Sequence, residues 1–173
     1  RDLHVRTRRQ RQMCIRDRFS HLALPLLDRE DLWFAEGFAS YMQYQVLQQQ
    51  QQLTGSPASW YLQKLQQVAP LLQVSELALV AQLKLWLQQR RYKAAYWGST
   101  LFFIEANQKL QQQNTNLPEL IQRYQRQNRL KDKNLQQLIS SLDALLKIPV
   151  FDPLLRKYQQ QPAKELWLSL IHI

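Results

Sequence analysis

The stretch that most constrains this chain runs from Leu32 to Tyr44, because it places a single acid, Glu36, in an apolar and aromatic pattern. Apolar residues recur around that acid at steps of three and four, which predicts a helix that buries a face. These residues are Leu32, Trp33, Ala35, Phe38, Ala39 and Met42. Carboxylates are almost never buried without a cation, a hydrogen bond or a metal. We therefore expect Glu36 to have a dedicated partner.

The remaining composition favours an all-α fold. The chain has 173 residues, 45% of them hydrophobic, and only three glycines, and Leu dominates while β-branched residues are sparse. That length suffices for one domain, or for a piece of a larger one. No apolar run approaches the roughly 18 to 20 residues that a membrane-spanning helix needs, so we expect no transmembrane segment.

Apolar periodicity and capping residues predict six or so helices, with no strand alternation and no repeat. The helix with Glu36 runs into a glutamine tract, and Thr54-Gly55-Ser56-Pro57 starts the next, for which Trp60, Leu62, Leu65 and Val68 form the expected apolar face. The other expected helical ranges are 71–89, which is irregular, 92–113, 117–124, 134–146 and 151–158. Asn114-Thr115-Asn116 is expected to cap the helix from 117, and Asn134 to start the next one. We expect residues 161–173 to form a tail.

The net charge of +10 suggests nucleic-acid binding, but its distribution argues against it. Residues 1–18 contain seven Arg and two Asp, so half of the net charge lies there, and the rest is scattered over Gln-rich helices. We therefore expect no nucleic-acid partner. The single cysteine, Cys14, excludes disulfides from the fold.

Residues 1–18 form a basic arm without helical periodicity, and we expect it to be disordered. Its string Met13-Cys14-Ile15-Arg16-Asp17 resembles translated sequencing-adapter read-through, and so does the segment 168–173 at the other end. We expect both segments to be non-native and residues 19–160 to be the helical part of one domain. The alternative is a natural arm that binds acidic surfaces.

His21 lies fifteen positions before Glu36, across a loop long enough to bring two consecutive helices together. His and Glu are both zinc ligands, and two His with one Glu and one open position form a catalytic zinc site.

At these residues the chain resembles a known family. The string Trp33-Phe34-Ala35-Glu36-Gly37-Phe38-Ala39-Ser40-Tyr41 is similar to the downstream zinc-ligand helix of gluzincin metallopeptidases, specifically the alanyl/leukotriene-hydrolase and glycyl aminopeptidase types. The resemblance implies an all-α, multi-helix fragment of a thermolysin-like catalytic domain, with Zn²⁺ as cofactor and His21 and Glu36 as metal ligands. It also implies peptide hydrolysis by metal-activated water, with a peptide as the substrate of the full-length protein.

The chain departs from the family at the first half of the H-E-x-x-H motif. With His21 as the last position, a His is expected at position 17 and the catalytic Glu at position 18, where this chain has Asp17 and Arg18. Read-through that overwrote the motif explains this, and a natural pseudo-enzyme is the alternative. Either way we expect this chain to be inactive as it stands. The short spacing from His21 to Glu36 favours the glycyl-type relatives.

The family also uses a tyrosine shortly before a small residue in a later helix, as the donor to the oxyanion. Tyr96, in Tyr96-Trp97-Gly98-Ser99, fits this catalytic role by resemblance, and Tyr92 competes for it. Gly98 and Ser99 permit close helix packing or approach to a ligand.

Alternative interpretations remain open. Glu36 can be a structural acid paired with Arg29, Arg90 or Arg91, and the chain can be a non-enzymatic, basic, all-helical module that binds nucleic acid or an acidic partner.

Overall fold

The computed structural model describes residues 23–52, 54–128 and 131–171, and across these ranges it is helical with no strand, which confirms the all-α class. No helix in the described part is long and apolar enough to span a membrane. The elements are the 3-10 helix η1 (Arg29–Asp31) and the helices α2 (Leu32–Gln49), α3 (Pro57–Gln66), α4 (Ala69–Gln73), α5 (Leu79–Gln88), α6 (Tyr92–Gln111), α7 (Leu117–Asn128), α8 (Leu135–Asp143), α9 (Phe151–Gln160) and α10 (Ala163–Ile171).

Three helices begin where the sequence supplies a capping side chain. Ser56, Asn116 and Asn134 precede α3, α7 and α8, and each side-chain oxygen accepts a hydrogen bond from the backbone N–H three residues later, at 3.4, 3.0 and 2.9 Å. Such caps satisfy N–H groups that have no partner within the helix. These starts could therefore be predicted from local sequence.

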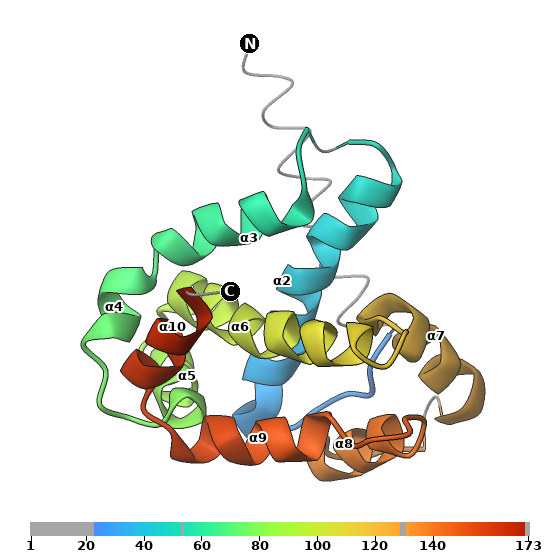
Figure 1. Ribbon diagram of the computed structural model, residues 1–173. Coiled ribbons are helices and arrows are strands. Elements are labelled where there is room, and N and C mark those ends of the chain that lie inside the picture. The colour runs from blue at the N-terminus through green and yellow to red at the C-terminus, as the bar shows by residue number, and fades with distance from the viewer. Residues whose placement is uncertain (1–22, 53, 129–130, 172–173) are drawn as a thin grey trace.

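The core is built around the contact between α2 and α6, which cross in the middle of the molecule (Figure 1). Trp33 and Phe34 of α2 lie edge-on to Phe102 of α6, with ring centroids 5.8 and 5.5 Å apart, and Phe34 is 4.9 Å from Phe103. Tyr158 of α9 joins the cluster at 5.4 Å from Phe102. Edge-to-face pairs add stability beyond the area that they bury.

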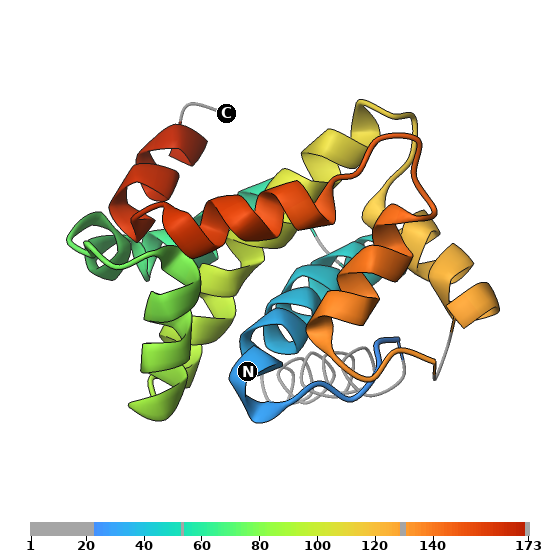
Figure 2. The same cartoon turned by 90° about the horizontal axis from the view of Figure 1, so that it is seen from below.

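The other helices surround this pair. In Figure 1, α4, α5 and α10 lie on one side of the crossing and α7 and α8 on the other. Viewed from below, α9 runs between these two groups, and it packs against α5, α6 and α8 (Figure 2). α9 therefore joins both sides of the fold.

The start of α9 is held by Asp143, the last residue of α8. Its Oδ1 accepts hydrogen bonds from the N–H groups of Val150 and Phe151, and its Oδ2 accepts one from Asp152, each at 2.8 Å. A carboxylate at this position also interacts favourably with the positive end of the helix dipole. One side chain thus fixes the turn between the two helices.

Two expected helices differ in detail. α3 buries Tyr61 and Leu65, whereas Leu62, expected on the apolar face, is 54% exposed. The irregular range 71–89 divides into α4 and α5, with Pro70 in the first turn of α4. The residues between them are not helical because their backbone is engaged elsewhere: the Leu77 carbonyl accepts a hydrogen bond from the N–H of Ala163 at 2.8 Å.

The prediction that residues 161–173 form a tail was wrong. Residues 163–171 form α10, which packs against α4 and α5 and buries Ala163, Leu166 and Trp167. Pro162 lies directly before this helix, at a position where proline is compatible with a helix start. From the sequence, Pro162 was expected to mark the end of the helical part of the chain. α10 adds to the six or so expected helices.

Candidate functional site

Glu36 differs from the residues around it on α2 in both charge and exposure. It is the only charged residue of this helix, and it is half-buried, whereas the other residues from Trp33 to Tyr44 are all buried. α2 is enclosed so completely because α6, α3 and α5 pack around it. The prediction of an apolar helix with one acid is confirmed, and the acid is where the burial is incomplete.

The helix start near Glu36 carries further charges. Asp31, at the N-cap position of α2, and the neighbouring Glu30 each lie 3.8 Å from the Nζ atom of Lys84 on α5. Burial raises the pKa of the Asp31 carboxyl above its ordinary value of 3.8, and Lys84 opposes that shift. The ion pairs link η1 and α2 to α5.

α2 and α6 approach each other closely directly beside Glu36. A Cβ atom on Gly37 would overlap the Cβ of Ser99 and would lie 3.0 Å from the Ser99 carbonyl oxygen. Gly98 meets α5 instead, where an added Cβ would be 2.9 Å from Leu83 Cδ2. The prediction that Gly98 and Ser99 allow close helix packing is therefore confirmed.

This contact brings the segments of two candidate residues together. Tyr96 lies on α6 about one helical turn before Ser99, and Glu36 directly precedes Gly37. Tyr96 is half-buried against the core, and its ring centroid is 6.1 Å from that of Tyr92. The tertiary structure thus brings the Tyr96 segment next to the Glu36 segment, although the two lie sixty positions apart in the sequence.

The predicted ligand His21 lies outside the described residues, and so do Asp17, Arg18, Cys14 and the basic arm. Every His and Cys of the chain falls outside the described ranges. Among residues 23–52, 54–128 and 131–171 there is no group of three or more His, Cys, Asp or Glu that could hold a metal. Glu36 is therefore the one predicted zinc ligand among the described residues.

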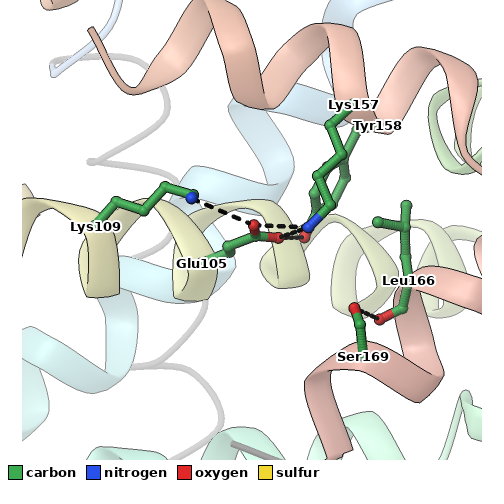
Figure 3. A network of polar contacts seen from close by, with 6 residues as sticks. All are labelled: Glu105, Lys109, Lys157, Tyr158, Leu166 and Ser169. Carbon is green, nitrogen blue, oxygen red and sulfur yellow. Dashed lines mark hydrogen bonds and ion pairs between the residues drawn. The ribbon is translucent and has the colours of Figure 1, made fainter. Parts of the chain in front are cut away.

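A buried acid was missed by the sequence interpretation. Glu105 of α6 is 7% exposed, and its carboxylate accepts hydrogen bonds from Lys157 Nζ at 2.7 and 3.0 Å and from the Tyr158 hydroxyl at 3.0 Å. Lys109 adds an ion pair at 4.0 Å, and Figure 3 shows these groups converging on Glu105. Burial and the adjacent Glu105 raise the pKa of Tyr158 well above 10.0.

The sequence did contain a signal for this network. Glu105 directly follows the apolar string Leu101-Phe102-Phe103-Ile104 and precedes Ala106, so it is an acid in an apolar stretch, as Glu36 is in α2. Its hydrogen-bond partners Lys157 and Tyr158 lie more than fifty positions away, on α9. These hydrogen bonds join α6 to α9.

Comparison with known proteins adds no relative. A scan against protein-family models and searches of curated proteins and of solved structures gave no match. By its structure the protein is a helical domain with a half-buried acid, Glu36, beside the contact between α2 and α6.

Proposed function

We propose that this chain is the helical, C-terminal part of a zinc aminopeptidase-like catalytic domain, inactive as it stands, in which Glu36 is the third metal ligand. The observation that carries the proposal is the position of Glu36. It is the only charge on α2, within the string that resembles the gluzincin ligand helix, and the only residue between Trp33 and Tyr44 that stays partly accessible.

The Tyr96 segment supports the same proposal. In the families that the chain resembles, a tyrosine of a later helix acts beside the metal-ligand helix, and here the close Gly37–Ser99 contact brings such a tyrosine to the neighbouring helix. The positions of the first His and of the general base carry Asp17 and Arg18, so this chain lacks two of the groups that the hydrolysis needs.

Zinc stoichiometry tests the proposal. The unmodified chain and the Asp17→His, Arg18→Glu double variant are equilibrated with Zn²⁺, freed of excess metal, and analysed for bound zinc per chain. We expect well under one zinc for the unmodified chain and about one for the double variant. Asp17→His adds the missing histidine to His21 and Glu36, which completes the three protein ligands of a catalytic zinc site.

Two further variants make the assignment specific. Adding Glu36→Gln to the double variant should reduce bound zinc again, whereas adding Glu165→Gln, at an exposed acid of α10, should not. Circular dichroism confirms that each variant is folded. No gain of zinc in a folded double variant, or full zinc retention with Glu36→Gln, would overturn the proposal.

A further inference from the structure

A groove separate from the Glu36 region lies between α2, α3, α6 and α7. It is open to solvent and has a volume of about 550 Å³, which is within the usual range for ligand sites. A second hollow of about 300 Å³ shares Gln45, Gln49, Pro118 and Glu119 with it, so the two form one elongated depression. Gln45 follows Glu36 by nine residues, which puts the two on opposite faces of α2 at about 100° per residue.

The lining is polar but almost uncharged. Its main part has one carboxylate, Glu119, no basic residue, and six amide side chains, which are Gln45, Gln49, Asn107, Gln108, Gln111 and Asn116. Amides both donate and accept hydrogen bonds, so they complement a neutral ligand that does the same. Ile104, Pro57 and Pro118 supply apolar surface between them.

The floor of the groove is formed by two stacked tyrosines and contains an unused donor. Tyr61 stacks on Tyr41 with ring centroids 4.9 Å apart, and its hydroxyl donates to the Tyr41 carbonyl at 2.6 Å. Gln45 Nε2 donates to the hydroxyls of Tyr61 and Tyr41, at 3.1 and 3.3 Å. Tyr41 is only 2% exposed, and among the described residues no acceptor receives its hydroxyl hydrogen.

Two amides at the opposite wall are held in a fixed orientation. Asn107 Oδ1 accepts a hydrogen bond from the Leu117 N–H at 2.9 Å, and Asn116 Oδ1 accepts one from the Glu119 N–H at 3.0 Å. Each amide NH₂ group is left without an acceptor in the described part of the chain. The groove thus holds three fixed donors, from Tyr41, Asn107 and Asn116, and the Oε1 of Gln45 as an acceptor.

We propose that this groove binds a short, extended, uncharged peptide segment, with its backbone carbonyls on Tyr41, Asn107 and Asn116 and a backbone N–H on Gln45. Peptide backbone presents carbonyl acceptors and N–H donors in alternation, which matches the lining. A carbohydrate fits less well, because the tyrosine rings are stacked on each other and buried and offer no open aromatic face. This site is independent of the proposed zinc ligand.

The test is an NMR titration of the isotope-labelled full chain with acetyl-tetraalanine amide. This peptide has no free amine or carboxylate, so its binding does not depend on an aminopeptidase site. We expect saturable shifts confined to the groove-lining residues of α2, α3, α6 and α7. Tyr41→Phe should weaken binding about five- to tenfold, because it removes one donor and keeps the ring.

A second variant guards against a folding effect. Asn107→Asp keeps the oxygen that caps Leu117 but removes the NH₂ donor, so it should weaken binding by a similar factor. Gln159→Glu makes the same amide-to-carboxylate change at an exposed position of α9 outside the groove, and it should leave the affinity unchanged. Absence of saturable binding, unchanged affinity in folded Tyr41→Phe or Asn107→Asp, or equal binding of maltotetraose would overturn the proposal.

Discussion

At the scale of single residues, Glu36 and Glu105 show that a local pattern can identify an acid that needs a partner but cannot identify the partner. Both are lone acids in apolar helices, and the physical rule that a buried carboxylate needs a partner applies to each. For Glu105 the partners are Lys157 and Tyr158 of α9. Replacing one member of such a buried pair leaves the other uncompensated, so this network couples α6 to α9.

Four of the buried tyrosines give the fold a predicted sensitivity to alkaline pH. Burial is the main cause that raises the pKa of Tyr41, Tyr61, Tyr124 and Tyr158 above 10.0. The contribution of these tyrosines to the stability of the fold is complete below pH 10. It decreases as the pH rises above 10, because the unfolded chain then loses hydroxyl protons that the folded chain retains. Each tyrosine contributes a slope of up to about 1.4 kcal/mol per pH unit.

Urea unfolding between pH 8 and pH 11 measures this slope. Tyr158→Phe should flatten it by up to about 1.4 kcal/mol per pH unit, since that side chain no longer titrates. Tyr92→Phe, at a tyrosine that is 48% exposed, serves as the matched control and should leave the slope unchanged. Ultraviolet absorbance should show tyrosinate from the four buried rings only as the chain unfolds. A slope that is identical in Tyr158→Phe would contradict the assignment.

At the scale of helices, two glycines set the distances between elements. Gly37 allows α2 to approach the backbone of α6, and Gly98 allows α6 to approach side chains of α5. The neighbours differ in how easily they move. Gly37 meets the Cβ and the backbone carbonyl oxygen of Ser99, whereas Gly98 meets only side-chain atoms, the flexible end of Leu83 and the ring of Trp86.

Gly37→Ala should therefore destabilise the protein even though alanine favours a helix by roughly 1 kcal/mol over glycine. We expect a net loss of about 1 to 3 kcal/mol from overpacking, measured by chemical denaturation. Gly98→Ala is the control and should cost less. Adding Ser99→Gly to Gly37→Ala should recover part of the loss, because it removes the nearest atom. Equal costs for both glycines would refute this account of the α2–α6 contact.

At the scale of the whole molecule, α10 completes the core although the sequence predicted a tail there. Its buried side chains cover α4 and α5, and a two-residue pairing of Ala78 with Pro162 joins the start of α5 to the segment before α10. The C-terminal helix is thus part of the packed domain.

Trp167→Ala should destabilise the protein by about 3 to 5 kcal/mol, the usual cost of removing a large buried aromatic side chain. Leu168→Ala, one position later and 57% exposed, should change stability by less than about 0.5 kcal/mol. Thermal unfolding of both variants makes the comparison. If the two variants melt at the same temperature, α10 does not contribute to the core as the structure indicates.

The sequence by itself determined what depends on neighbours along the chain. Apolar periodicity predicted α2 and α6, and Ser56, Asn116 and Asn134 predicted three helix starts, because caps and helical faces involve residues only a few positions apart. The same reasoning identified Glu36 as the unusual residue of α2. Where local signals were ambiguous, as at Pro162, the prediction was wrong.

Only the tertiary structure decided which distant residues meet. The Lys157 partner of Glu105 is 52 positions away, and the groove collects side chains from four helices. Burial of a whole helix also depends on how many neighbours pack around it, which is why α2 is enclosed on nearly all sides while Glu36 is not. Such contacts form when helices associate, so no local pattern records them.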